Sequence, residues 1–331
     1  MNMRIKTNIL LLLVAAIAAS CGSKKTTENV EGATPVGPAF CADSAYRFCK
    51  EQCDFGPRTM NSKAHDLCEA WIESNFKRMG MMVTKQKFTV NGYDGTPLRS
   101  TNIIASHRPE LTTRVMICAH WDSRPWADND PDSANWRKPV LAANDGASGV
   151  AVMLELARLL KGGTTLNVGV DFICFDAEDW GTPQWYDGED SSDTWALGAQ
   201  YWSRHLHKPN YEARYGILLD MVGGQGAVFH QEGQSLQMAR AIVDKVWNAA
   251  AAIGYASSFP TSMGGYITDD HIPVNQYAHI PCIDIIPYYA DCEASSFGPT
   301  WHTVFDDMQH IDKNTLLAVG QTLVQVIFSE K

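Results

Sequence analysis

Apolar and polar residues alternate along this chain in two distinct ways. Apolar runs typical of strands are predicted at residues 81–90, 101–107, 114–121, 166–175, 215–221 and 282–286. Helical spacing of apolar residues occurs in two stretches within residues 42–79, interrupted near Gly56 and Pro57, and over residues 148–160, 195–206, 235–253 and 314–327. Strands that alternate with helices predict an α/β fold whose largely parallel sheet is covered on both faces.

The first residues differ in character from the rest. Arg4 and Lys6 precede an apolar run over residues 9–19, which has the length of a signal-peptide core and is short for a membrane span. The run ends in Ala-Ala-Ser-Cys-Gly, which resembles the lipobox of bacterial lipoproteins. This resemblance predicts a signal peptide over residues 1–21, lipidation of Cys21 and an exported, membrane-anchored protein; ordinary cleavage near Cys21 is the alternative.

The rest of the chain divides in two. Residues 22–38 are rich in Gly, Ser, Thr, Lys and Pro, which predicts a flexible tether. Residues 39–331 contain no internal repeat and no linker in mid-chain, so we expect one domain, and we expect it to be monomeric.

Charge and cysteine content narrow the choice of partners. A net charge of −10 with no cluster of Lys and Arg argues against nucleic acid as a partner. Export permits disulfides, and lipidation of Cys21 would leave eight of the nine cysteines. Cys118 and Cys174 lie inside strand-like runs and are expected to be free thiols. Pairing stays open for Cys41, Cys49, Cys53, Cys68, Cys282 and Cys292.

Acids and histidines follow the predicted strands. Most of these residues follow a predicted strand, and Asp145 precedes a predicted helix. In chain order they are His120, Asp122, Asp145, Asp176, Glu178, Asp179, Asp220 and His302. The carboxyl ends of parallel strands meet at one sheet edge, so we expect these side chains to lie together. Carboxylates and imidazoles without a thiolate suit zinc, and a cation would offset the repulsion within residues 176–179.

Each of these residues also has a purely structural explanation. Asp145 in Asn-Asp-Gly could be a turn residue or a helix N-cap. His120 and Asp122 could share a hydrogen bond at a strand end, and Asp220 could cap the following loop. Asp176 is expected to have only such a structural role. The convergence of all of them at one sheet edge favours a common site.

Several motifs together carry a resemblance to a known family. His-x-Asp (His120, Asp122), NDGASG with Asp145, EDWG with Glu178 and Asp179, LLD with Asp220 and WHT with His302 resemble the zinc-dependent aminopeptidases. The resemblance implies a three-layer α/β/α sandwich in which the first acid of the pair is a general base and the second binds zinc. This chain has Glu-Asp where the family usually has Glu-Glu, and the shorter Asp179 can still reach a metal.

A narrower resemblance lies within that family. DDHIP over residues 269–273, TWHT over residues 300–303, Asp306 and Asp307 are similar to glutaminyl cyclases, and the segments 119–132 and 139–158 are similar to the bacterial ones. These enzymes convert the N-terminal glutamine of peptides and proteins to pyroglutamate and release ammonia. The resemblance implies one zinc per chain on Asp145, Asp179 and His302.

The same resemblance implies further roles. Glu178 would be the proton shuttle, Asp220 and Asp269 a hydrogen-bonded pair, and Trp185 and Trp301 walls of the glutamine pocket. His120 corresponds to a ligand of a second metal in the aminopeptidases, so it and Asp122 are candidates for a second site or for a supporting role. The structural alternatives are core packing for the tryptophans and, for the acidic pair, a helix from Ile272 capped by Asp270.

Two other functions remain open at this point. The first is a two-zinc aminopeptidase that uses His120 and Asp220 for its second metal. The second is a non-catalytic surface module on the same fold, which is disfavoured because the proposed ligands and Glu178 are all present.

Overall fold

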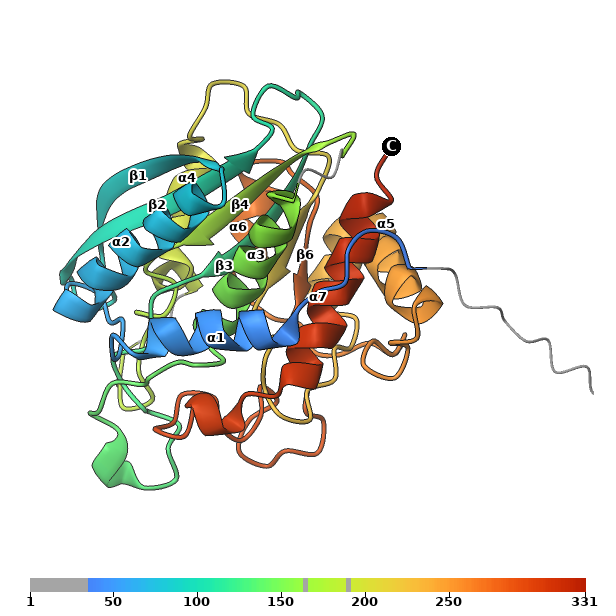
Figure 1. Ribbon diagram of the computed structural model, residues 1–331. Helices are drawn as coiled ribbons and strands as arrows, with labels where there is room; N and C mark the ends of the chain where they lie inside the picture. The colour runs from blue at the N-terminus through green and yellow to red at the C-terminus, as the bar shows by residue number, and fades with distance from the viewer. Residues whose placement is uncertain (1–34, 163–165, 189–191) are drawn as a thin grey trace, which may run out of the picture. The chain divides into compact units, whose positions relative to one another are not determined.

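A single mixed sheet runs through the described part of the molecule (Figure 1). The computed structural model describes residues 35–162, 166–188 and 192–331, so the predicted signal peptide and most of the tether lie outside the described residues. The strand order is β1-β2-β4-β3-β5-β6, and the strands are β1 (Met82–Asn91), β2 (Pro97–His107), β3 (Arg114–His120), β4 (Gly169–Phe175), β5 (Gly216–Leu219) and β6 (Cys282–Ile285). β1, β2 and β4 pair antiparallel, whereas β4, β3, β5 and β6 are parallel.

Helices cover both faces of this sheet, as predicted. They are α1 (Ala42–Cys53), α2 (Lys63–Arg78), α3 (Ala147–Leu160), α4 (Leu197–Arg204), α5 (Gly233–Ala252), α6 (His271–Gln276) and α7 (Lys313–Phe328). In Figure 1, α1, α2, α3 and α7 lie on one face, and residues of α5 belong to the same core. Trp202 of α4 and Val274 of α6 pack on the other face. Alternate residues of β3 enter the two cores, because successive strand side chains point to opposite faces.

The register of the parallel strands brings their carboxyl ends to one level. His120 at the end of β3 pairs with Phe175 at the end of β4. Cys118 pairs with Leu218 of β5, and Leu219 in turn pairs with Ile285 of β6. The loops that follow these four strands therefore begin at the same edge of the sheet, where the sequence predicted the polar side chains to meet.

The element boundaries differ from the predictions mainly in β2. This strand begins at Pro97 rather than residue 101, because β1 and β2 form an antiparallel hairpin that pairs as far as Asn91 with Pro97. The second helix ends where predicted, with Met79 at the C-cap and Gly80 beyond it at φ +80°.

The described cysteines are all free thiols. Cys118 and Cys174 are buried and unpaired, as expected. The remaining six described cysteines, whose pairing the sequence left open, are also unpaired; four of them are buried, Cys292 is partly buried and Cys41 is exposed. Cys21 lies outside the described residues. In the part of the chain that the structure describes, no helix combines the length and apolar character needed to cross a membrane.

Candidate active site

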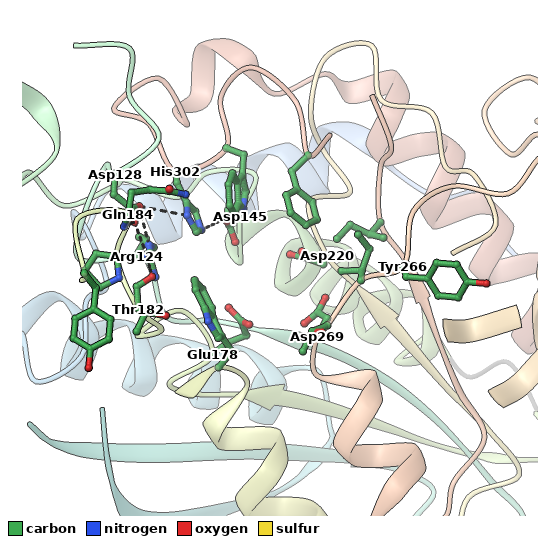
Figure 2. Close-up of a pocket in the computed structure, with 18 residues that line it drawn as sticks. Arg124, Asp128, Asp145, Glu178, Thr182, Gln184, Asp220, Tyr266, Asp269 and His302 are labelled. Carbon is green, nitrogen blue, oxygen red and sulfur yellow. Dashed lines mark hydrogen bonds and ion pairs between the residues drawn. The ribbon is translucent and has the colours of Figure 1, made fainter. Parts of the chain in front are cut away.

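A cavity of about 520 Å³ lies where the loops leave the carboxyl ends of the parallel strands (Figure 2). Its walls come from segments that are distant in sequence, and they include Asp145, Glu178, Asp220, Asp269, Trp301 and His302. Four of the sequence-predicted acids, one of the two predicted tryptophans and the late histidine thus line one cavity, whereas Asp122, Asp176 and Asp179 are not part of its lining. Its size is that of a site for a small ligand or the end of a peptide.

Asp145, Asp179 and His302 form one compact group. One ligand atom from each lies within 4.8 Å of the others, and all three residues are buried. His302 Nε2 is 3.2 Å from Asp179 Oδ1 and 3.7 Å from Asp145 Oδ2. Two carboxylates and one imidazole are suitable zinc ligands that leave a further position for substrate.

Asp179 gives a direct test of whether a cation fits this group. Its side chain is 1% exposed, and neither carboxylate oxygen has a hydrogen-bond partner of good geometry. The nearest donors are His302 Nε2 and Arg124 Nη1, at 3.2 Å and 3.6 Å from Oδ1. A buried carboxylate without donors is costly unless a cation compensates it. The residues present therefore fit a zinc ion.

His120 belongs to a second group that shares Asp145. Its Nε2 lies 2.9 Å from Asp145 Oδ1 and 3.3 Å from Asp220 Oδ1, and these three residues also satisfy the spacing of a metal site. Burial lowers the pKa of His120, but hydrogen bonds with Asp122, Asp145 and Asp220 outweigh burial and raise it well above the usual value. His120 is thus placed to act either as a cation between these acids or as a metal ligand.

Asp122 supports the acidic pair through the backbone. Its Oδ1 accepts the Glu178 N–H at 3.0 Å, and its Oδ2 accepts the Asp179 N–H at 3.2 Å. Asp122 belongs to none of the groups of described residues that are spaced to hold a metal, so it fits the supporting role. Asp176 turns away from the cavity and binds the side chain of His65 and the N–H of Thr101, which accounts for it without a metal.

The loop that carries Asp145 is held in the same manner by Asp306. Asp306 accepts the N–H groups of Asn144 at 2.7 Å and Asp145 at 3.0 Å. Gly146 follows at φ +95°, where a Cβ would lie 2.8 Å from the carbonyl oxygen of Asp122. No side-chain hydrogen bond caps α3, so Asp145 is not an N-cap. The turn directs its carboxylate into the cavity.

Glu178 is a buried acid at the wall of the cavity. It is 9% exposed and lines the cavity. Burial raises its pKa well above the usual value, and the charges of Asp179 and Asp269 raise it further, against the opposing effect of His120. A carboxyl group whose pKa moves toward neutrality is suited to exchange protons.

Asp220, which follows β5, and Asp269, which precedes α6, line the same cavity. Burial, followed by the charge of Asp220, raises the pKa of Asp269 to about 7. Burial also raises the pKa of Asp220. The repulsion favours one protonated carboxyl group over two charges. No hydrogen bond joins the two side chains in the structure, where Asp220 Oδ1 and Asp269 Oδ2 are without a partner. Asp270 occupies the N-cap position of α6 but makes no side-chain capping bond, so the capping alternative fails.

The aromatic walls differ from the prediction. Trp301 lines the cavity, and its ring stacks on His302 at 3.7 Å between centroids. Trp185 lies outside the lining: its ring stacks on Trp136 at 6.4 Å, and the guanidinium of Arg137 lies 3.7 Å from its centroid. The cavity is lined instead by Trp195, which was predicted only to begin a helix.

Two further residues were not singled out from the sequence. Arg124 and Asp128 are almost fully buried, and both line the cavity beside His302. Burial alone would raise the pKa of Asp128, but hydrogen bonds from His302 and Arg124 hold it below the usual value. No sequence pattern marks such a pair, because its partners are mainly backbone atoms.

Comparison with known proteins agrees with this geometry. The structure is similar to that of a glutaminyl cyclase of Bacteroides thetaiotaomicron, with a TM-score of 0.87 and 50% identity over 89% of this chain and 100% of that one. It is equally similar to a protein described as a leucine aminopeptidase precursor of the same organism, with a TM-score of 0.86, 50% identity and coverage of 90% and 100%.

The sequence relatives are more distant. Aminopeptidase YwaD of Bacillus subtilis is 28% identical over 267 residues, which make up 76% of this chain and 50% of that protein. This chain thus spans half the length of that relative. The model of Peptidase family M28 matches residues 102–327, a stretch that contains both groups of candidate ligands. The chain belongs to Peptidase family M28.

Proposed function

We propose that this protein is a zinc-dependent glutaminyl cyclase that converts the N-terminal glutamine of peptides and proteins to pyroglutamate and releases ammonia. One observation carries the proposal: Glu178 and the Asp220–Asp269 pair line the same cavity as Asp145 and His302, whose group with Asp179 fits one zinc. The similarity to the Bacteroides glutaminyl cyclase supports it.

The reaction needs little more than positioning and proton transfer. The α-amine attacks the side-chain amide carbon of the same residue, a new C–N bond forms, and the bond to the departing ammonia breaks. Both reacting groups belong to one molecule, so a pocket that folds the glutamine provides proximity. Zinc on Asp145, Asp179 and His302 would polarise the amide carbonyl.

Glu178 has the position and the raised pKa for the proton transfer. It takes a proton from the attacking nitrogen and returns it to the leaving nitrogen, so the carboxylate is regenerated in each cycle. The attacking amine, whose pKa is roughly 7.7–8.0, must be neutral. The Asp220–Asp269 pair lies across the cavity, where it can accept hydrogen bonds from the substrate nitrogen atoms.

The aromatic walls separate this reaction from hydrolysis. Trp301 and Trp195 both stack on His302 and line the cavity, so they exclude water from the side of the proposed ligand. A cyclase requires this exclusion, because water at the same position would cleave the peptide bond instead.

A two-metal aminopeptidase is the second candidate, and the group His120, Asp145 and Asp220 favours it. The deciding experiment is incubation of the purified protein with a dipeptide that begins with glutamine. We expect ammonia and an intact peptide lighter by one ammonia. Free glutamine and the released second residue, with two zinc ions per chain, would establish the aminopeptidase.

We also propose that residues 39–331 act as a monomeric catalytic domain, anchored to the membrane of a bacterial cell through lipidated Cys21. Support for the anchor is the lipobox-like sequence. Cys21→Ala should move the protein from the membrane fraction to the soluble fraction, and light scattering of the domain should give the mass of one chain.

A further inference from the structure

Arg124 uses its whole guanidinium group inside the protein. The side chain is 1% exposed and lies four residues beyond the end of β3. Nε and Nη2 donate to the two carboxylate oxygens of Asp128, at 3.0 Å and 2.7 Å. The other donors go to the carbonyl oxygens of Asp179 and Gly181, both at 3.1 Å, and of Thr182 at 3.2 Å. An arginine has five N–H donors, and here each one has an acceptor.

These acceptors include the backbone of a proposed metal ligand. Three carbonyl groups of the segment 179–182 point at one rigid, planar group, which fixes the turn that carries Asp179. Nη1 also lies 3.6 Å from Asp179 Oδ1. Arg124 therefore restrains both the main chain and the carboxylate of Asp179.

Asp128 makes the connection to the other proposed ligand. Its Oδ1 lies 3.5 Å from His302 Nδ1, on the side of the ring opposite to the nitrogen that faces Asp179. The next residue, Asn129, donates its N–H to the carbonyl oxygen of His302 at 3.0 Å. His302 has φ +53°, a left-handed conformation that is uncommon for a non-glycine residue.

Trp195 closes the arrangement. Its ring is parallel to the His302 ring, with an interplanar angle of 6° and 6.1 Å between centroids. The guanidinium carbon of Arg124 lies 4.6 Å from the centroid of the same tryptophan. The buried guanidinium of Arg124 thus contacts Asp128 and Trp195, which both lie against His302, and also the loop that carries Asp179.

We propose that Arg124 and Asp128 are positioning residues that hold Asp179 and His302 in the mutual geometry a zinc ion requires, and so set the zinc affinity of the site. The inference rests on the zinc-binding role proposed above. The two ligands are 123 positions apart in sequence (302 minus 179), and this pair is what joins them. A lysine would keep the charge but could not reproduce five donors in one plane.

The chain contains a matched control at the other end of β3. Arg114 donates to both oxygens of Asp171 and to three carbonyl oxygens, those of His107, Arg108 and Leu111. The side chains of Arg114 and Asp171 are 4% and 1% exposed. The chemistry is the same, but neither residue lines the cavity or contacts a proposed ligand.

The test compares four conservative variants by zinc competition against a chromogenic chelator and by thermal unfolding of the metal-free protein. We expect Arg124→Lys and Asp128→Asn to weaken zinc binding on the order of 10–100-fold and to lower kcat more than they change KM. Arg114→Lys and Asp171→Asn should lower the unfolding temperature but leave zinc affinity within about threefold.

The outcomes are distinguishable. Wild-type zinc affinity in folded Arg124→Lys and Asp128→Asn would overturn the inference, as would equal weakening by the Arg114 and Asp171 variants. If Arg124→Lys does not fold, Asp128→Asn decides, because it keeps the side-chain volume and the three carbonyl contacts of Arg124. If the protein without substitutions binds no zinc, both the proposed function and this inference are wrong.

Discussion

The two ends of β3 carry the same buried arginine motif with different consequences. At the amino end, Asp171 accepts hydrogen bonds from Arg114, Ser106 and Tyr211, and both of its oxygens are satisfied. At the carboxyl end, Arg124 and Asp128 are equally well bonded, but neither buried oxygen of the neighbouring Asp179 has a hydrogen bond of good geometry.

This contrast separates stability from function. A buried ion pair whose donors and acceptors are all hydrogen-bonded has a structural role and needs no ligand. Buried oxygens left without partners beside an equally rigid frame indicate that a ligand completes the site. The difference between the two ends therefore lies not in burial or charge but in what remains unsatisfied.

The largest expected effect comes from removing a proposed ligand. His302→Ala should abolish stoichiometric zinc binding and lower cyclase kcat/KM by ~10⁴-fold or more, because the oxyanion loses its stabilisation. Metal analysis and ammonia release measure the two effects. Full zinc occupancy in this variant would show that His302 is not a ligand.

A change of Glu178 should affect chemistry and leave the metal in place. Glu178→Gln preserves the shape of the side chain but cannot accept the proton, so kcat should fall by about 10²–10⁴-fold with zinc content unchanged. Steady-state kinetics on a glutaminyl dipeptide measure this. Near-normal turnover would exclude Glu178 as the proton shuttle.

A substitution at the amino end of β3 should lower stability and leave zinc binding unchanged. Asp171→Ala leaves the Arg114 guanidinium buried without its counter-charge, which should cost ~3–5 kcal/mol in the free energy of unfolding. Denaturant titration measures the loss, and the zinc affinity of the folded fraction should match that of the unchanged protein. A weaker zinc site in this variant would remove the distinction between the two ends.

A buried carboxylate with several hydrogen bonds should also make the free energy of unfolding depend on pH. Burial would raise the pKa of Glu232, but hydrogen bonds with His271 and with the N–H groups of Gln234 and Ile267 lower it from 4.5 to about 2. Its stabilisation is present above pH 4.5 and is lost as the pH falls toward 2, by up to ~3 kcal/mol. Glu232→Gln should flatten the acid limb of the stability curve; an unchanged limb contradicts the assignment.

The smallest effect distinguishes the two predicted tryptophans. Trp301→Ala should raise KM for a glutaminyl dipeptide about tenfold, which corresponds to ~1.4 kcal/mol, because it opens the cavity wall. Trp185→Ala should change KM less than threefold, since its ring packs on Trp136 and Arg137. Equal effects would mean that the substrate extends to Trp185.

Sequence patterns predicted the layers of the fold and the edge at which the site lies. Both follow from periodicity and from the rule that parallel strands present their carboxyl ends together. The start of β2 was missed because Leu98–Ser100 is not a continuous apolar run and is fixed by pairing with β1.

Site details that depend on backbone geometry were beyond the reach of sequence. Arg124 and Asp128 act through carbonyl and N–H groups, which every residue possesses, so no motif reveals them. The exchange of Trp185 for Trp195 has a similar cause: the path of the loop after Asp179 decides which tryptophan reaches the cavity.

The most direct test of the account is anomalous diffraction at the zinc edge from crystals of the zinc-loaded protein. We predict one fully occupied peak per chain, within bonding distance of Asp145, Asp179 and His302, with the Arg124–Asp128 pair intact beside it. A second peak of equal height between His120, Asp145 and Asp220 would contradict the account and indicate a two-metal hydrolase.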